Sequence, residues 1–341
     1  MKIAHVRERH APAGAGFRLV AALDTSARRW LDLEIGRHRA IRRDERKAHN
    51  AVLFRQPIAT LDEHLARGLR VEALAEIVEG FEPADDEDEA VLTADDLRFG
   101  PPILRPTSLR DFYAFERHVS TMWQRRGQDV PEAWYRLAIF YFGNVSEIRG
   151  PEEPVWAPRG SSELDYELEI AALIDTPVKD LAAARGPEAI GGYTIMNDWS
   201  ARDLQRDETT VRLGPAKGKD FATTLGPWLV TPDELADASH DKGYRLAATA
   251  EVNGRELSRG LWSDAYFSFG EMIERASADV RLVPGDLIGS GTVGTGCLLE
   301  TREASGFDRY LQPGDRVTLK VERLGALSSP VIAREEHRHV S

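Results

Sequence analysis

The sequence predicts a mostly β (α+β) protein, with a small N-terminal β-rich domain over residues 1–100 and a larger domain over residues 101–341. Three observations support this class. The 341 residues are 42% apolar and 29% charged, which is ordinary for a globular chain. Beyond residue 100, short apolar runs recur between Gly, Pro and Asn turns. An acidic stretch and a proline-rich stretch separate the two parts near residue 100.

Composition also excludes several classes of function. The formal net charge is −12 and no basic block is present, so we expect no nucleic-acid partner and no anionic membrane partner. The single cysteine, Cys297, excludes an intrachain disulfide, and its surroundings predict a small buried residue. The N-terminus lacks an apolar targeting segment and no run of about 20 apolar residues occurs, so we expect a soluble cytoplasmic protein.

The first hundred residues are expected to contain a hairpin and one helix. Residues 17–24 and 29–33 are strand-like runs on either side of a polar turn. Thr60 followed by Glu63 predicts a capped helix start. The helix is expected to run towards Gly80 with an apolar stripe of Leu61, Leu65, Leu69, Ala73 and Ile77.

An acidic linker is expected at residues 82–89, where six of eight side chains are carboxylates. Their mutual repulsion opposes packing and favours a solvated loop. The stretch lacks the glycine and the spacing of a calcium-binding loop, so we do not expect a metal there.

The larger part is expected to consist mainly of strands. Apolar runs predict strands at 166–174, 225–230, 245–252, 282–290 and 316–322. Turns are expected at Asn253-Gly254, 284–286 and 313–315. Two short helices are predicted, at 109–124 with Ser108 as N-cap and at 268–276.

The segment from Leu164 to Ile170 alternates apolar and acidic residues. Successive side chains of a strand point to opposite faces, so Asp165, Glu167 and Glu169 are expected to share one face. Carboxylates this close are unfavourable unless a cation lies between them, and a hard divalent cation suits oxygen ligands. A solvated strand edge has the same pattern, so this segment alone leaves both interpretations open.

Two further segments carry polar side chains of possible chemical use. An apolar strand at 191–196 leads into Asp198, a further oxygen ligand, and into Arg202 and Gln205, which are three residues apart and face a common ligand on a turn or helix. The glycine-rich backbone before Lys219 suits an anionic substrate, although an exposed loop would have the same composition.

Asp111 and His118 are seven residues apart, which is two helical turns, so both are expected on one face of the predicted helix at 109–124. A lone histidine is usually structural. Here a carboxylate that joins a metal and a base of near-neutral pKa would lie together, and the base would activate water.

Six motifs together resemble the fumarylacetoacetate hydrolase family in order and spacing. They cover about residues 105–333 and are Asp-Phe-Tyr-x4-His (111–118), Leu-Asp-Tyr-Glu-Leu-Glu (164–169), Met-Asn-Asp-Trp-Ser-Ala-Arg-Asp-Leu-Gln (196–205), Gly-Pro-x-x-Gly-Lys (214–219), Pro-Gly-Asp-Leu-Ile-Gly-Ser-Gly-Thr (284–292) and Tyr-Leu-Gln-Pro-Gly-Asp (310–315). The resemblance implies a mixed β-sandwich roll around the site, a small N-terminal β-rich domain and a homodimer.

The resemblance also implies roles for eleven residues. The ligands of Mg²⁺, Mn²⁺ or Ca²⁺ would be Asp111, Glu167, Glu169 and Asp198. His118 would be the general base and Glu300 the carboxylate that orients it. The donors to developing negative charge would be Arg202, Gln205 and Lys219, and the substrate contacts Tyr141 and Thr292.

The expected function is metal-dependent hydrolysis of a carbon–carbon bond in an acylpyruvate or related β-diketo acid, in the catabolism of an aromatic compound. A keto-acid decarboxylase, isomerase or hydratase on the same site is the alternative, because these reactions share an enolate. A non-catalytic protein that binds a metal and a carboxylate is a third. Tyr141 is followed by Phe142-Gly143-Asn144 where eukaryotic members have His-Gly-Arg, so a fumaryl substrate is not implied.

Overall fold

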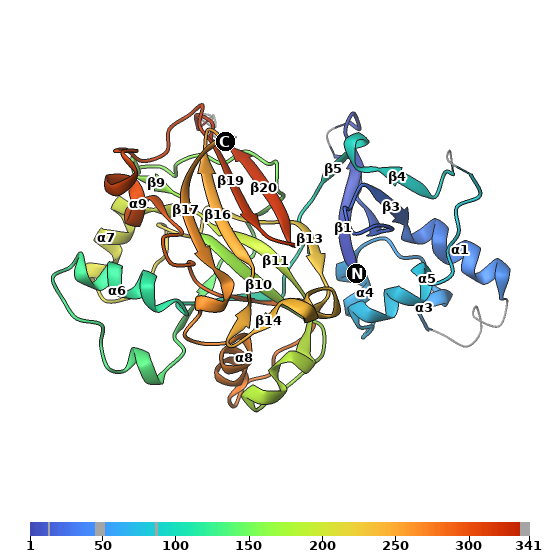
Figure 1. Cartoon of the computed structure of the whole chain (residues 1–341), viewed down its shortest axis with the longest axis horizontal. Helices are drawn as coiled ribbons and strands as arrows, with labels where there is room; N and C mark the ends of the chain where they lie inside the picture. Colours follow the sequence, from blue (N-terminus) through green and yellow to red (C-terminus); the bar gives the residue numbers. More distant parts are fainter. Residues whose placement is uncertain (13, 45–51, 86–87, 335–341) are drawn as a thin grey trace, which may run out of the picture.

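The computed structural model describes residues 1–12, 14–44, 52–85 and 88–334. A large mixed sheet runs through the molecule, with the N-terminal region at one end and the remaining elements around the other (Figure 1). Its main path has the order β4-β3-β2-β1-β13-β11-β10-β18-β6-β7, with β5 beside β1 and β8 beside β13. These strands are β1 (Lys2–Glu8), β2 (Arg18–Ala22), β3 (Arg29–Asp32), β4 (Val91–Thr93), β5 (Leu97–Phe99), β6 (Ser108–Phe112), β7 (Phe140–Gly143), β8 (Ile148–Arg149), β10 (Leu168–Ile174), β11 (Ile190–Asp198), β13 (Thr223–Val230) and β18 (Asp286–Gly289).

A four-stranded antiparallel sheet of order β17-β16-β19-β20 packs against the large sheet. The main apolar core lies between them, where Ile170 and Ile195 of the large sheet and Ala250 and Leu319 of the small one are fully buried. This is the predicted mixed α+β, strand-rich fold. The remaining strands are β16 (Ala247–Val252), β17 (Arg255–Leu261), β19 (Arg316–Val321) and β20 (Gly325–Pro330), with the short pairs β9 (Leu164–Asp165) and β12 (Ser200–Ala201), and β14 (Ser239–His240) and β15 (Gly243–Tyr244).

The helices are short and lie around the sheets (Figure 1). The α-helices are α1 (Leu33–Arg43), α3 (Val52–Arg55), α4 (Leu61–Ala66), α5 (Ala75–Val78), α6 (Glu116–Gln124), α7 (Arg202–Thr210), α8 (Phe269–Ser277) and α9 (Leu298–Ser305). The 3₁₀ turns are η1 (Val71–Leu74), η2 (Ala94–Asp96), η3 (Trp134–Arg136), η4 (Ala183–Ala189), η5 (Pro232–Ala238) and η6 (Trp262–Asp264). Across the described ranges, no helix is both long and apolar enough to span a bilayer.

Several sequence predictions are confirmed by the structure. The N-terminal hairpin is β2 and β3, which pair antiparallel. The five predicted strands of the larger part correspond to β10, β13, β16, β18 and β19. Asn253 and Gly254 both have positive φ in the hairpin between β16 and β17, as a two-residue turn requires. Ser268 and Glu271 form a reciprocal capping box at the start of α8.

The predicted helix at 109–124 is wrong in its first half. Ser108 is not an N-cap but the first residue of β6, which pairs with β18 and β7, and the helix begins only at Glu116. The apolar positions Leu109, Phe112 and Phe115 fit a helical period, yet a strand buried on both faces also lacks a strict alternation. Pairing with β18 and β7 makes this segment a strand, and the spacing of its apolar residues could not distinguish a strand from a helix.

The N-terminal region differs from its prediction in three details. The expected helix from Leu61 to Gly80 is divided into α4, η1 and α5, because Gly68 adopts φ +74° after α4. Within the acidic stretch, Asp88 is buried and not solvated, since Arg39 donates two hydrogen bonds to it at 2.5 and 2.6 Å; residues 86–87 lie outside the described ranges. Strand β1 pairs with β13, so this region extends the large sheet. The domain division near residue 100 stays a prediction.

Candidate active site

Three buried carboxylates converge at the centre of the large sheet. Asp111 is in β6, Glu169 in β10 and Asp198 at the end of β11, and the order β11-β10-β18-β6 places these strands close together. The side chains are 1 to 3% exposed, and one carboxylate oxygen from each lies within 4.8 Å of the others. The backbone N–H of Gly291 donates to Glu169 Oε2 at 3.0 Å and to Asp111 Oδ1 at 3.2 Å. We call Asp111, Glu169 and Asp198 the carboxylate cluster.

The carboxylate cluster carries negative charge that its surroundings do not balance. Burial raises the pKa of Asp111 and of Glu169 well above the ordinary values, and the neighbouring carboxylates raise both further. Burial also raises the pKa of Asp198, although the Lys219 ammonium opposes the shift. Protonation or a cation is therefore required to hold these groups together.

Two buried cations lie beside the cluster. Lys219 Nζ contacts the carboxylates of both Glu167 and Asp198. Arg202, at the start of α7, binds Glu167 Oε1 through Nη1 at 2.8 Å and Asp165 Oδ2 through Nε at 2.8 Å. Burial alone would raise the pKa of Glu167, but Lys219 and Arg202 hold it well below its usual range. Glu167 is thus paired with both Lys219 and Arg202, and it lies at the border of the carboxylate cluster.

The donor set fits a hard divalent cation. Five buried carboxylates, the cluster with Asp165 and Glu167, face the two cations Lys219 and Arg202, so full ionisation leaves an excess of three negative charges. A doubly charged ion with oxygen ligands compensates most of that excess. Asp111, Glu169 and Asp198 would hold such an ion.

His118 and Glu300 form a second polar pair. His118 is in α6 and Glu300 in α9, and Nδ1 of the histidine lies 2.9 Å from Oε2 of the glutamate, with both side chains almost fully buried. Glu300 is held by the backbone N–H of Thr295, which donates to Oε1 at 3.2 Å. The ring of Tyr113 meets the imidazole edge to face at 5.4 Å. The prediction that Asp111 and His118 share one helix face is wrong, because Asp111 is in β6 and His118 in α6; His118 is nevertheless near enough to Glu167 to help lower its pKa.

The remaining predicted site residues contact these groups directly. The Tyr141 hydroxyl donates to Asp198 Oδ2 at 2.6 Å, and Thr292 Oγ1 lies 3.4 Å from Glu169 Oε1. Gln205 Oε1 accepts from Arg202 Nη1 at 3.1 Å. The other terminal nitrogen of Arg202, Nη2, is buried and has no hydrogen-bond partner among the described residues. This buried guanidinium donor is therefore available to an anionic or carbonyl oxygen.

Two residues have contacts that the sequence interpretation did not give them. Asp165 does not join the carboxylate cluster: it accepts from Arg202 and from the backbone N–H groups of Leu298 and Leu299 at 2.8 and 3.0 Å, which caps α9. Cys297 is a buried small residue as predicted, and it also lies beside His118 and Glu300. No sequence pattern relates Asp165 to Leu298 or Cys297 to His118, because these residues are distant in the chain.

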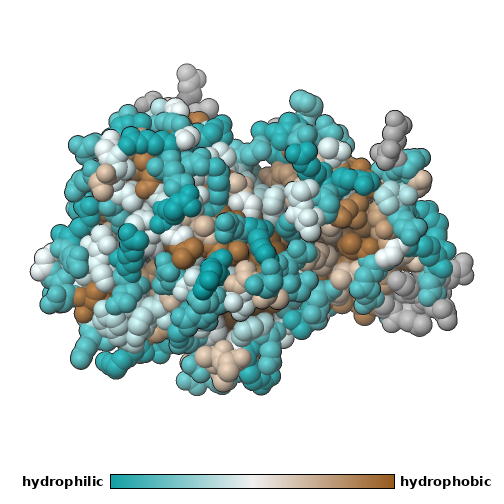
Figure 2. All heavy atoms as spheres, in the orientation of Figure 1, coloured by the Kyte–Doolittle hydropathy of each residue, from teal (hydrophilic) through white to brown (hydrophobic). Residues whose placement is uncertain are grey.

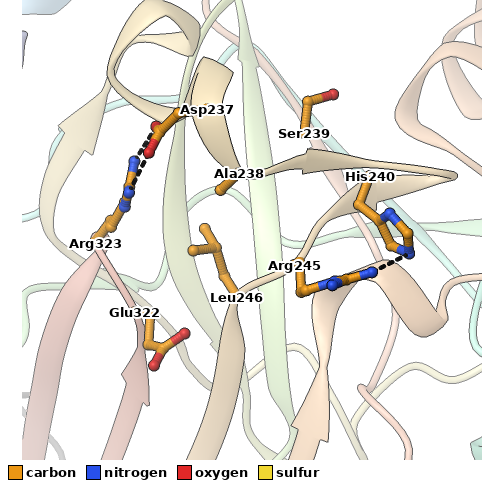
Figure 3. A pocket seen from close by; sticks show the side chains of 8 residues that line it. All are labelled: Asp237, Ala238, Ser239, His240, Arg245, Leu246, Glu322 and Arg323. Carbon is orange, nitrogen blue, oxygen red and sulfur yellow. Dashed lines mark hydrogen bonds and ion pairs between the residues drawn. The ribbon is translucent and has the colours of Figure 1, made fainter.

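A surface cavity of about 700 Å³ lies elsewhere, beside β14 and β16 (Figure 3). Its polar side chains already have partners: Arg323 binds Asp237 through two contacts, Arg245 Nη2 lies 3.1 Å from His240 Nε2, and Glu322 accepts from the backbone N–H of Ala247. No member of the carboxylate cluster lines this cavity. We therefore place the candidate active site at the cluster and not here.

Comparison with known proteins identifies the family of the chain. Residues 107–332 match the model of the C-terminal domain of fumarylacetoacetate (FAA) hydrolase. The chain therefore belongs to the fumarylacetoacetate hydrolase family, whose relatives and neighbours include hydrolases and isomerases.

One curated relative is the 2,4-didehydro-3-deoxy-L-rhamnonate hydrolase of a Sphingomonas species, 31% identical over 203 residues, which are 59% of this chain and 66% of the relative. The chain spans only 61% of the length of other curated relatives, at 33 to 34% identity.

Solved structures share the fold along almost the whole chain. The fumarylacetoacetate hydrolase of Exiguobacterium antarcticum has a TM-score of 0.69 at 24% identity, covering 98% of this chain and 100% of that one. A probable 2-hydroxyhepta-2,4-diene-1,7-dioate isomerase of Mycobacterium abscessus has a TM-score of 0.65 at 23% identity, with the same coverage. At this identity the likeness establishes the fold and not the reaction.

Proposed function

We propose that the protein is a divalent-metal-dependent hydrolase that cleaves a carbon–carbon bond of an acylpyruvate or related β-diketo acid. The observation that carries this proposal is the pair His118 and Glu300, 2.9 Å apart, beside buried carboxylates and a buried guanidinium nitrogen without a partner. This arrangement offers a base for water, a site for a cation and a donor for an oxyanion.

His118 would act as the general base. Its Nδ1 lies 2.9 Å from Glu300 Oε2, although the ring is not aligned for a hydrogen bond; a small rotation of the ring would place a proton on Nδ1 towards Glu300 and leave the lone pair of Nε2 free to accept a proton from water. Glu300 does not touch the reacting atoms; it would fix the ring and stabilise the imidazolium that forms. The water oxygen then bonds to the distal carbonyl carbon of the substrate.

Arg202 would stabilise the oxyanion that this addition creates. Its Nη2 is the free buried donor, and its orientation is fixed by Asp165, Glu167 and Gln205. When the tetrahedral adduct collapses, the carbon–carbon bond breaks and its electron pair passes to the pyruvate part as an enolate. That enolate takes up a proton, which gives pyruvate and a carboxylic acid as products.

Mg²⁺ is the ion that we propose for Asp111, Glu169, Asp198 and, at their border, Glu167; when bound, it would lower the energy of negative charge on the substrate oxygens. Lys219 holds Glu167 and Asp198 in place and adds a fixed positive charge to the site. Tyr141 and Thr292, which already contact cluster carboxylates, would border the substrate. We also propose a homodimer, which the family resemblance supports and sedimentation of the purified protein would test.

An isomerase or decarboxylase acting on a related keto acid is the second candidate, favoured by the isomerase among the proteins that share this fold. Proton movement between carbon atoms would use His118 without consuming water. Hydrolysis and isomerisation therefore differ in whether an oxygen atom from solvent enters the product.

The test is a turnover assay of the Mg²⁺-loaded protein in water labelled with oxygen-18. The substrates are acylpyruvates, oxaloacetate and an unsaturated 2-keto acid. Hydrolysis predicts pyruvate and a labelled carboxylic acid, lost with EDTA and in His118→Gln. His64→Gln is the matched control, because His64 is similarly buried in the N-terminal region, where its side chain has the backbone of Arg70 as its one hydrogen-bond partner among the described residues. Unlabelled isomer, or carbon dioxide from oxaloacetate alone, would refute the hydrolase proposal.

A further inference from the structure

We propose that His118, Cys297 and Glu300 form a second metal site, selective for Zn²⁺ and similar thiophilic ions, at which zinc inhibits the enzyme. The site shares no residue with the carboxylate cluster. Its inhibitory effect rests on the proposed function of His118, whereas zinc binding itself does not.

The distances among the three side chains match a zinc coordination shell. The metal-binding atoms of His118, Cys297 and Glu300 all lie within 4.8 Å of one another. Cys297 Sγ is 3.5 Å from Glu300 Oε2, and His118 Nδ1 is 2.9 Å from the same oxygen. With Zn–S of about 2.3 Å and Zn–N and Zn–O of about 2.0 Å, tetrahedral geometry requires S···O of about 3.5 Å and N···O of about 3.3 Å. The S···O distance already matches, and the N···O distance needs to lengthen by only a few tenths of an ångström.

An unused ligand atom points to the same conclusion. His118 is 3% exposed. Its Nδ1 is close to Oε2 of Glu300, but the ring is not aligned for a hydrogen bond to that oxygen, and Nδ1 has no other hydrogen-bond partner among the described residues. Buried imidazole nitrogens normally have a partner, because leaving one unpaired costs about 1–3 kcal/mol. A zinc ion bound to Nδ1 would supply it.

The donor types separate this site from the carboxylate cluster. Three carboxylates favour hard ions such as Mg²⁺, whereas a thiolate with an imidazole and a carboxylate favours Zn²⁺. Three protein ligands leave a fourth tetrahedral position for water. Binding would displace the thiol proton of Cys297 to solvent.

Zinc at this site would inhibit for a direct reason. Nδ1 of His118 and the carboxylate of Glu300 would both coordinate the ion, so Glu300 could no longer stabilise an imidazolium and the coordinated ring would be a weaker base. Cys297 has no part in the proposed reaction. Its removal should therefore relieve zinc inhibition while leaving Mg²⁺-supported turnover nearly unchanged.

Co²⁺ is the probe for binding, added to protein that holds excess Mg²⁺. Cys297 is the single cysteine of the chain, so a thiolate-to-cobalt charge-transfer band in the near ultraviolet reports this residue alone. We expect the band in the wild type, its disappearance when Zn²⁺ is added, and its absence in Cys297→Ala. Thr301→Val is the matched control: Thr301 is buried one turn further along α9, contacts the Cys297 carbonyl and offers no ligand, so the band should persist.

The inhibition arm compares the same variants. Zn²⁺ should abolish turnover of the wild type and of Thr301→Val reversibly. Cys297→Ala should need at least about tenfold more zinc, because loss of even a residue that only supports a metal ligand lowers metal affinity by about 10–100-fold. Absence of the cobalt band in wild type that binds cobalt, or equal zinc sensitivity in Cys297→Ala, would overturn the proposal. If Cys297→Ala does not fold, Glu300→Gln, measured by the band and not by turnover, tests the same site. The band without any turnover would count against the proposed function and not against the zinc site.

Discussion

Asp165→Asn should destabilise the protein strongly, although Asp165 touches neither the proposed substrate nor the carboxylate cluster. Its side chain is fully buried and accepts three hydrogen bonds: Oδ2 from Arg202 Nε at 2.8 Å and Leu299 N at 3.0 Å, and Oδ1 from Leu298 N at 2.8 Å. It thereby joins the guanidinium that we propose as oxyanion donor to the start of α9, the helix that carries Glu300. Asp165 is a positioning residue.

The expected magnitude follows from the hydrogen-bond directions. An asparagine has one acceptor oxygen, so its NH₂ group must face either the Leu298 N–H or the donors of Arg202 and Leu299. At least one buried donor then loses its partner, and Arg202 loses one of its two carboxylates. Loss of one member of a buried ion pair costs about 3–5 kcal/mol. We expect about 3 kcal/mol, the lower end of that range, because Arg202 keeps Glu167.

Urea denaturation followed by fluorescence would measure this loss. With an m-value of about 3 kcal/mol/M, the midpoint should fall by about 1 M. Asp203→Asn is the control, since Asp203 also accepts from Ser161, Ser162 and Leu204 but is nearer the surface and forms no ion pair with any described residue; it should cost about 1 kcal/mol. Folded Asp165→Asn should also lose about tenfold or more in kcat through misplacement of Arg202. A midpoint and kcat equal to those of the wild type would refute the reasoning.

Three further predictions concern the donors, the cluster and a helix cap. Arg202→Lys should lower kcat by about 10²–10³ because an ammonium cannot satisfy Asp165, Glu167 and a substrate oxygen together, whereas Arg206→Lys, on the exposed side of the same helix, should be neutral in the same assay. The raised pKa values of Asp111, Glu169 and Asp198 mean that the metal-free folded state binds protons that the unfolded state releases, so their contribution to stability is present below about pH 4 and is lost as the pH rises. Calorimetry should therefore show that the increase in Tm produced by Mg²⁺ is larger at pH 8 than at pH 5; both pH values lie above the ordinary carboxylate pKa of about 4. A smaller increase at pH 8 would contradict the prediction. Ser268→Ala should lower the free energy of unfolding by about 1 kcal/mol through loss of the α8 capping box, with unchanged kcat.

The sequence could predict those parts of the molecule that depend on neighbours along the chain. The hairpin of β2 and β3, the Asn253-Gly254 turn and the Ser268 cap each depend on a few consecutive residues. The strand β6 depends instead on pairing with β18, about 180 residues later, and its buried Leu109 and Phe112 fit a helical period equally well. The surface visible in Figure 2 is largely hydrophilic, which agrees with the net charge of −12 but does not distinguish a strand from a helix in the buried segment around β6.

Dependence on distant residues also explains why the sequence predicts the shared face of Asp165, Glu167 and Glu169 but not the partner of each carboxylate. A period of two places Asp165, Glu167 and Glu169 on one side of the chain, and all three do reach the polar centre of the molecule. Their partners come from elsewhere: Leu298 is 133 residues from Asp165, and Lys219 is 52 residues from Glu167. Each partner decides whether a carboxylate caps a helix, holds a cation or remains for a metal. Charge balance, which requires all these partners at once, is therefore a property of the folded site, and replacing Asp165 tests it without touching a proposed ligand.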